Sequence, residues 1–250
     1  WVSYPDMVLL AEGEPVIIHA GVESNFKITP QQLEAAITPK TRIFVINSPS
    51  NPTGVAYTKA ELAALAEVLK QFPQVLIATD DMYEHIIWSE EPFSNIVNAC
   101  PQLYERSIVL NGVSKVYAMT GWRIGYAGGP ADLIKAMKKV QSQSTSNPCT
   151  ISQWAAVEAL NGSHEFIAAH NEVFKRRRNM VVDRLNAIEG ITRPTPDASS
   201  RSSASREGSP SFARSGSRSS TAYRKSGGSF SRNDSSLGRS PEPKVGGNCS

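Results

Sequence analysis

Four polar clusters hold the side chains that could do chemistry, and each lies at an end of an apolar run. Acidic, amide, hydroxyl, amine and guanidinium groups all occur in them. The clusters are Asn47-Ser-Pro-Ser-Asn-Pro-Thr-Gly54, Thr79-Asp-Asp-Met-Tyr83, Asn111-Gly-Val-Ser-Lys115 and Met119-Thr-Gly-Trp-Arg-Ile-Gly125. Taken singly, each has an ordinary explanation, because Pro and Gly form rigid turns anyway and a lone lysine is usually solvated.

Taken together, the clusters suit the chemistry of pyridoxal phosphate. A lysine forms a Schiff base with the aldehyde of this cofactor, and an acid keeps its pyridine nitrogen protonated. An arginine grips a phosphate with two parallel hydrogen bonds, while Asn and Tyr side chains bond the ring hydroxyl. Ligands of open α/β sheets bind at the carboxyl ends of the strands, so these groups are expected to meet there.

The apolar runs that flank the clusters predict five strands. Each run is continuously apolar rather than alternating, which is typical of a parallel sheet covered on both faces. The runs are 16–19, 41–47, 75–79, 107–111 and 123–127.

Helical patterns lie between these runs. Thr58-Lys-Ala-Glu61 is a capping box, and leucines and a valine follow it at helical spacing. Pro130 suits the first position of another helix, and two more are predicted over 150–160 and from 163 to about 189. The alternation of strands and helices predicts an α/β, doubly wound sheet.

The sequence resembles the fold-type I, class I/II aminotransferases, and in particular the bacterial aspartate aminotransferase subgroup. The resemblance covers about residues 1–197, and its most specific part is Ser114-Lys115 with Arg123 eight residues on. It implies the mostly parallel doubly wound sheet of the large domain of these pyridoxal-phosphate-dependent transferases. The other matching segments are Trp1-Val-Ser-Tyr-Pro5, 47–54, Asp80-Asp-Met-Tyr-Glu-His85, 119–126 and Gln141-Ser-Gln-Ser-Thr-Ser146.

Carried over residue by residue, the resemblance assigns the central roles to three side chains. Lys115 would be the catalytic residue, which forms the Schiff base and shuttles the proton between substrate Cα and cofactor C4′. Asp80 would pair with the pyridinium nitrogen, and Arg123 would bind the phosphate.

Three further residues would complete the cofactor site by the same resemblance. Asn51 and Tyr83 would bond the ring hydroxyl, with Asn51 also near the substrate carboxylate. Trp1 would stack on the cofactor ring. The four histidines have no metal-ligand spacing, so no metal site is expected.

Charge is unevenly distributed along the chain, which has 250 residues and a net charge of +3. Residues 199–250 contain 18 Ser, and their nine basic and three acidic residues give +6. The first 198 residues hold 17 basic and 20 acidic residues, a net charge of −3. We therefore expect no nucleic-acid partner for the body, and no apolar run approaches the ~20 residues that cross a membrane.

The Ser/Arg-rich tail, residues 198–250, is expected to be disordered because it has few large apolar groups. It could instead be a basic arm for RNA or acidic partners. A third interpretation is a frameshift, since TCN serine codons read one base earlier become NTC codons for Phe, Leu, Ile or Val. We favour the frameshift or a truncated gene, because a buried strand would suit the chain at this point.

The resemblance also implies how the chain is organised. Residues 1–162 would be the cofactor-binding large domain without its N-terminal part, and 163–197 a long helix leading into a truncated small domain. A Gly-rich phosphate loop and the arginine that grips the substrate α-carboxylate would lie outside this chain. Related enzymes are cytoplasmic homodimers with shared active sites, so we expect a fragment with little or no activity alone.

The expected function is therefore transamination between an amino acid, with aspartate as the first choice, and a 2-oxo acid. The alternatives within the fold are a pyridoxal-phosphate-dependent lyase or an aminotransferase of other specificity. The alternative from another class is a non-catalytic protein, either a degenerate product or a basic-tail binding protein.

Overall fold

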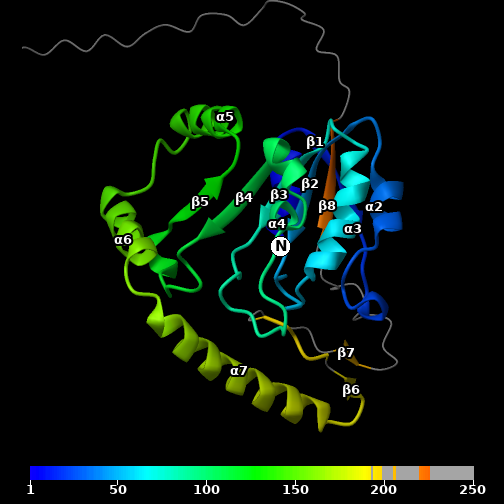
Figure 1. Cartoon of the computed structure of the whole chain (residues 1–250), viewed down its shortest axis with the longest axis vertical. Helices are drawn as coiled ribbons and strands as arrows, with labels where there is room; N and C mark the ends of the chain where they lie inside the picture. Colours follow the sequence, from blue (N-terminus) through cyan, green and yellow to red (C-terminus); the bar gives the residue numbers. More distant parts are fainter. Residues whose placement is uncertain (193, 199–204, 207–219, 226–250) are drawn as a thin grey trace, which may run out of the picture.

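The computed structural model describes residues 1–192, 194–198, 205–206 and 220–225, and these form a sheet with helices around it (Figure 1). The helices are α1 (Ser3–Leu10), α2 (Pro30–Ala36), α3 (Lys59–Lys70), α4 (Ile96–Ala99), α5 (Ala131–Ser142), α6 (Thr150–Asn161) and α7 (Glu165–Asn186). Short 3₁₀ helices are η1 (Val22–Ser24), η2 (Pro101–Arg106) and η3 (Thr120–Trp122). The strands are β1 (Gly13–Ile18), β2 (Thr41–Asn47), β3 (Leu76–Asp80), β4 (Ser107–Gly112), β5 (Gly125–Gly128), β6 (Ile191–Thr192), β7 (Ser205–Arg206) and β8 (Ser220–Lys225).

The main sheet has six strands in the order β1-β8-β2-β3-β4-β5. β2, β3 and β4 are parallel, and β5 joins β4 as an antiparallel edge strand. The parallel register places Asn47 beside Asp80, so the polar residues that follow β2 and β3 start at the same edge. This agrees with the predicted mostly parallel α/β sheet.

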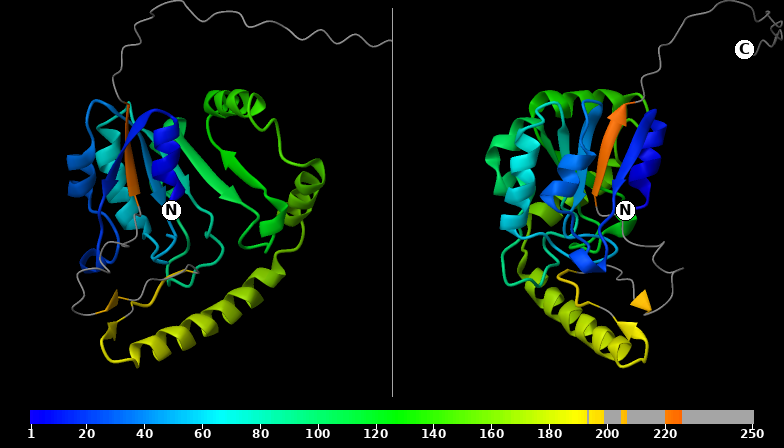
Figure 2. Two further views of the ribbon diagram at one scale, coloured as in Figure 1. Left: turned by 180° about the vertical axis from the view of Figure 1, so that it is seen from behind. Right: turned by 90° about the vertical axis from the view of Figure 1, so that its right-hand side faces the viewer.

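Residues of β2 and β3 point alternately to two apolar layers. Phe44, Ile46 and Ile77 belong to a large buried cluster with side chains of α2 and α3. Val45 and Ala78 form a second cluster on the opposite face, where side chains of α1 and α5 pack. The sheet is therefore covered on both faces, as continuous apolar strands require. Figure 2 shows α1 and α3 on opposite sides of the strands.

Local capping signals fix where two helices begin. Thr58 accepts from the Glu61 amide at 3.2 Å, and Glu61 accepts from the Thr58 amide at 2.7 Å, which confirms the predicted capping box of α3. Thr29 and Gln32 form an equivalent capping box on α2, a helix that the sequence reading did not single out. Such reciprocal bonds satisfy backbone donors that the first turn leaves free.

Arg106 joins the far end of α3 to the strands. Its guanidinium donates to the carbonyls of Phe72 at 3.0 Å, Val75 at 2.6 Å and Leu69 at 2.5 Å. These carbonyls lie at the end of α3 and in the turn before β3, while Arg106 itself immediately precedes β4. One side chain thus joins the end of α3 and the turn before β3 to the start of β4.

The chain leaves the sheet through α5 and α6 and returns along α7, which runs below the sheet in Figure 1. Trp88 and Arg178 connect α7 to the body, with the guanidinium carbon 4.9 Å from the Trp88 ring centroid. Beyond α7, Asp197 accepts from the Ala56 amide at 3.2 Å, and the Ala198 amide donates to Gly54 at 2.8 Å. Residues 194–198 therefore form a strap that reaches the loop after β2.

Two sequence expectations need correction. Arg123 was expected at the start of a strand, but β5 begins at Gly125 and Arg123 has a left-handed backbone with φ 56°. The tail was expected to be disordered, yet Ser205–Arg206 and Ser220–Lys225 are strands, and the latter pairs with two neighbours. Pairing with distant strands sets this conformation, which the Ser-rich composition of the tail did not indicate. The rest of the tail prediction lies outside the described residues.

Candidate functional site

Asn47 links the ends of the two central parallel strands. Its side-chain amide donates to the Asp80 carbonyl at 3.0 Å, and its Oδ1 accepts from the Asn51 amide at 2.9 Å. Asn47 is buried, so these bonds satisfy groups that water cannot reach. They hold the loop that carries Asn51 against the end of β3.

Asn51, Tyr83 and Lys115 meet at this edge although they come from three different loops. The Asn51 Nδ2 donates to the Tyr83 hydroxyl at 3.1 Å. The Lys115 Nζ lies 5.6 Å from the centroid of the Tyr83 ring, within the range of a cation–π contact. Lys115 is exposed and sits in the turn after β4, so its amine is accessible from solvent.

Asp80 ends β3 and holds two donors. Its Oδ1 accepts from the Met82 amide at 3.2 Å, and its Oδ2 accepts from the Tyr4 hydroxyl of α1. Burial raises the pKa of Tyr4, and the negative charge of Asp80 raises it further. Tyr4 therefore remains a neutral donor that points at the carboxylate.

Trp1 lies close to the same carboxylate. Burial lowers the pKa of its α-amino group, and the charge of Asp80 acts in the opposite direction. Trp1 as a whole residue is 49% exposed.

Arg123 stands apart from these contacts and is exposed. Its Nη1 donates to the Thr120 carbonyl at 2.9 Å, and the Thr120 hydroxyl donates to the Ser114 carbonyl at 3.2 Å. Arg123 is thereby connected to the backbone of the residue before Lys115. The structure thus brings together Asn51, Tyr83 and Lys115, places Trp1 and Asp80 beside each other, and links Arg123 only indirectly.

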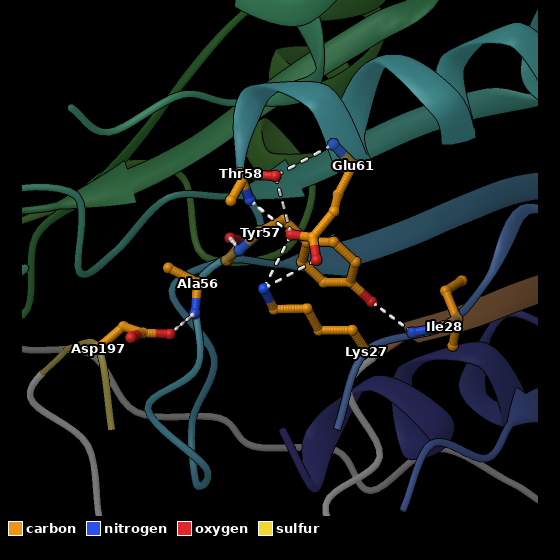
Figure 3. A network of polar contacts seen from close by, with 8 residues as sticks. Lys27, Ile28, Ala56, Tyr57, Thr58, Glu61 and Asp197 are labelled. Carbon is orange, nitrogen blue, oxygen red and sulfur yellow. Dashed lines mark hydrogen bonds and ion pairs between the residues drawn. The ribbon is translucent and has the colours of Figure 1, made fainter. Parts of the chain in front are cut away.

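The loop that carries Asn51 is anchored beyond its own ends. Figure 3 shows the segment from Ala56 to Thr58, in which the Tyr57 hydroxyl accepts from the Ile28 amide at 2.8 Å. The Tyr57 amide donates to the Ser48 hydroxyl at 3.1 Å, and Asp197 approaches the Ala56 amide from the strap. These contacts fix the loop at its C-terminal side.

Asp81 is a second carboxylate at this edge and faces away from solvent. It is 1% exposed and accepts from the Thr79 hydroxyl at 2.6 Å and the Asn95 amide at 2.6 Å. Burial raises the pKa of Asp81 to about 6, against the opposing effect of these two hydrogen bonds. Because Asn95 is the N-cap of α4, Asp81 ties the end of β3 to that helix.

Sequence reasoning missed two residues of this site. Tyr4 was named only as part of the segment Trp1–Pro5, and its partner Asp80 lies 76 residues away in the sequence. Asn47 was counted as the first residue of a turn, although its side chain braces the loop. Only its polar type at the end of an apolar run could have indicated this.

Comparison with known protein families identifies the family of this chain. The profile described as "Aminotransferase class I and II" matches residues 1–199. The chain belongs to the class I and II aminotransferase family. Two similar proteins are the aspartate/prephenate aminotransferases of Cereibacter sphaeroides and Nitrosomonas europaea. They are 61% identical over 197 residues and 60% identical over 191 residues.

This aminotransferase chain spans about half the length of the curated relatives it matches. The aligned parts are 79% of this chain and 49% of the Cereibacter protein, and 76% and 48% for the Nitrosomonas protein. The crystal structure of the aspartate aminotransferase from Rhizobium meliloti is similar, with a TM-score of 0.78, 52% identity and coverage of 80% of this chain and 50% of that one. An aspartate aminotransferase double mutant from Thermus thermophilus has a TM-score of 0.74 and 41% identity, covering 80% and 51%.

The described part of the chain has neither a cluster of metal ligands nor a membrane-spanning helix. No group of three or more His, Cys, Asp or Glu residues within it could hold a metal ion. None of its helices combines the length and the apolar character that a membrane span requires.

Proposed function

We propose that the edge formed by β2, β3 and β4 binds pyridoxal phosphate, with Lys115 as the covalent anchor. The donor set fits this group: a primary amine and an amide–phenol pair meet at this edge, where β3 ends with the carboxylate of Asp80. Asp80 already accepts a hydrogen bond from one neutral O–H donor, the Tyr4 hydroxyl, through its Oδ2. A carboxylate oxygen has room for a second donor, so this contact is compatible with a ring N–H.

Each residue would act on the bound group in a different way. Asp80 would hold the proton on the ring nitrogen, and Asn51 and Tyr83 would orient the ring through its hydroxyl. Arg123 would hold the phosphate and Trp1 would cover one face of the ring. The part that binds the cofactor would be residues 1–162, and residues 163–197 would lead into a second domain.

Bound pyridoxal phosphate supplies an aldehyde that condenses with amines and a ring that withdraws electrons from the neighbouring carbon. Lys115 would contribute the amine that attaches the cofactor and, once released, would move a proton to or from the substrate Cα. Tyr83 lies beside Lys115 and would keep the amine over the same face of the site. The convergence of Asn51, Tyr83 and Lys115 is the observation that carries this proposal.

The proposed reaction of the whole protein is transamination between aspartate and a 2-oxo acid. The two similar aspartate/prephenate aminotransferases support aspartate as the amino donor and add prephenate to 2-oxoglutarate as an acceptor to be tested. We further propose a cytoplasmic homodimer as the working form of the whole protein. This chain alone is proposed to bind the cofactor with little or no turnover.

Cofactor attachment can be tested directly on the purified chain. Pyridoxal phosphate is added, the mixture is reduced with borohydride, and the modified lysine is located by peptide mass spectrometry. We expect a visible absorbance band before reduction and modification at Lys115. The Lys115→Ala variant should lose both, whereas Lys139→Ala, which removes an exposed lysine of α5, should retain both.

The same preparation separates cofactor binding from catalysis. Aspartate with 2-oxoglutarate, and aspartate with prephenate, are incubated with the chain and amino transfer is followed. Rapid turnover would contradict the proposal that this chain alone is nearly inactive. Unspecific labelling of many lysines, with none favoured, would contradict the proposed site.

A further inference from the structure

Two hydrogen bonds fasten the loop after β3 to the end of β4. The Asp81 amide donates to the Leu110 carbonyl at 2.9 Å, directly after β3 ends. Three residues later, Glu84 accepts from the side-chain amide of Asn111 at 2.6 Å through its Oε1. One bond thus lies before Tyr83 in the sequence and the other directly after it.

Close packing at Gly112, the last residue of β4, supports the same junction. A Cβ atom at this position would lie 3.1 Å from the Met82 Cε and 3.0 Å from the Ile124 carbonyl oxygen. Both distances are shorter than ordinary van der Waals contacts, and a glycine in a strand often marks such a close approach. The loop after β3 therefore lies directly against the end of β4.

Asn111 uses both ends of its side-chain amide. Its Nδ2 donates to Glu84, while its Oδ1 accepts from the Gly112 amide at 2.7 Å. An ionised carboxylate can only accept, so Glu84 determines which way the Asn111 amide is turned. Asn111 is 9% exposed, so water is a poor substitute for either partner.

The Glu84 carboxylate also lies within electrostatic reach of two tyrosines. Burial raises the pKa of Tyr117 and of Tyr126, and the negative charge of Glu84 raises both further. Tyr117 lies two residues after Lys115, and Tyr126 belongs to β5, the strand next to β4. The carboxylate is therefore close to the turn that carries the lysine as well as to the strand that precedes it.

We propose that Glu84 is a positioning residue of the candidate site, which holds the Lys115 turn in place through Asn111. Its carboxylate fixes Asn111, and Asn111 fixes the amide of Gly112, where β4 ends and the turn begins. Because Glu84 directly follows Tyr83, this link determines how far the Lys115 amine lies from the tyrosine ring. The role rests on the proposed attachment of pyridoxal phosphate to Lys115.

Substitutions at Glu84 and Asn111 separate the hydrogen bond from the charge. Glu84→Ala removes the acceptor, whereas Glu84→Gln keeps a carbonyl oxygen and removes only the charge. Asn111→Asp sets two acceptors opposite each other. Combining Asn111→Asp with Glu84→Gln restores a bond of reversed direction, in which the glutamine donates and the aspartate accepts. Glu34→Ala, which removes an exposed glutamate of α2, is the control.

The first measurement is the rate at which pyridoxal phosphate attaches to Lys115 in the full chain. It is followed by the visible absorbance band and by peptide mass spectrometry after borohydride reduction. We expect roughly tenfold slower attachment in Glu84→Ala and in Asn111→Asp, the effect of one lost hydrogen bond to a charged group. Glu84→Gln, the double variant and the control should stay within about twofold of the unmodified chain.

Recovery in the double variant is the outcome that a space-filling role of either residue would not produce. A double variant that attaches the cofactor as slowly as Asn111→Asp alone would overturn the proposal. Equal rates in Glu84→Ala and the unmodified chain would overturn it as well.

Backbone hydrogen exchange measures the same link without the cofactor. The amide of Gly112, which donates to Asn111, and that of Val113, which donates to the Ile124 carbonyl at 3.4 Å, report on the start of the turn. We expect both amides to exchange roughly tenfold faster or more in Glu84→Ala, while β3 keeps its protection. Unchanged exchange of Gly112 would contradict the proposal. Loss of protection throughout β3 would also contradict it, since the effect would then be global.

Together the two measurements distinguish a failure of this role from a failure of the proposed function. If the unmodified chain does not attach the cofactor at Lys115, the proposed function fails, while hydrogen exchange still shows whether Glu84 holds the turn. If the unmodified chain and Glu84→Ala attach it equally fast, the proposed function stands and the positioning role is refuted.

Discussion

The side-chain amide of Asn51 donates to the hydroxyl of Tyr83 at 3.1 Å, although the two residues lie on loops that follow different strands. Because the hydroxyl oxygen accepts this bond, the phenolic proton is free to be donated elsewhere. The amide therefore sets the direction in which Tyr83 can offer its proton. Lys115 lies over the ring of the same tyrosine, so Tyr83 contacts both the amide of Asn51 and the amine of Lys115.

Replacement of Tyr83 by Phe tests this orientation. The variant keeps the ring beneath Lys115 but removes the hydroxyl that Asn51 contacts. One lost hydrogen bond is worth about 1 kcal/mol, so we expect roughly fivefold weaker binding of pyridoxal phosphate and a shifted absorbance band. Titration by fluorescence measures the affinity. Tyr104→Phe, at a position 47% exposed, is the control and should bind like the unmodified chain.

The contact between Tyr4 and Asp80 should contribute to stability. Tyr4→Phe removes the donor to Asp80 Oδ2, and hydrogen bonds to charged groups are worth about 1.5–3 kcal/mol. We expect the free energy of unfolding in urea to fall by about this amount. A fall of the same size in a variant that also carries Asp80→Asn would show that the two residues act together. Strictly additive losses would refute the pairing.

The buried carboxyl of Asp81 should make stability depend on pH. Its pKa is raised to about 6 in the folded chain, from an ordinary value of 3.8. The folded state therefore binds more protons than the unfolded state between these values, and the contribution of Asp81 to stability is lost as pH rises from about 4 to about 6. Urea unfolding at several pH values should show a flatter dependence for Asp81→Asn over this interval.

Glu61 should make stability depend on pH in the direction opposite to that of Asp81. Burial raises its pKa, but the hydrogen bonds from Lys27 and Thr58 outweigh burial and the net shift is downward. Its stabilising contribution is therefore present above the ordinary glutamate value and is lost as pH falls through the lowered pKa. In Glu61→Gln the loss of stability in acid should be smaller. If both variants changed the pH profile in the same direction, these assignments would be wrong.

Asp197 should stabilise the loop after β2, although it lies 141 residues from its partner Ala56 in the sequence. Asp197→Ala leaves the Ala56 amide without this acceptor, and we expect the free energy of unfolding to fall by about 1 kcal/mol. The amide of Ala56 should also exchange faster with deuterium. Asp132→Ala, whose side chain is 98% exposed, is the matched control. An unchanged Ala56 amide would mean that the strap does not brace the loop.

Local signals in the sequence were sufficient for much of the central sheet. The predicted strand 41–47 coincides with β2, because an apolar β-branched run ends at a proline-rich loop. The capping box of Thr58 and Glu61 fixed the start of α3 for similar reasons. Both features depend only on residues near one another in the chain, so composition and spacing were enough.

Contacts between distant residues were not predictable in this way. Arg123 adopts a left-handed conformation that its position before apolar residues did not indicate. Tyr4 finds Asp80 only because α1 covers one face of the sheet. β8 lies in a Ser-rich tail, and its strand conformation depends on two partners far away in the sequence.

The hydrogen bonds of the Arg106 guanidinium determine which end of the sheet is held firmly. It donates to three carbonyls between Leu69 and Val75, and it directly precedes β4. The amino ends of β3 and β4 are therefore held at the C-terminus of α3. A lysine here would offer a single ammonium and could not span the three acceptors in the same fork geometry. Because Asp80 and the turn that carries Lys115 lie at the carboxyl ends of the same two strands, the contacts that fix this end of the sheet are separate from the residues of the candidate site.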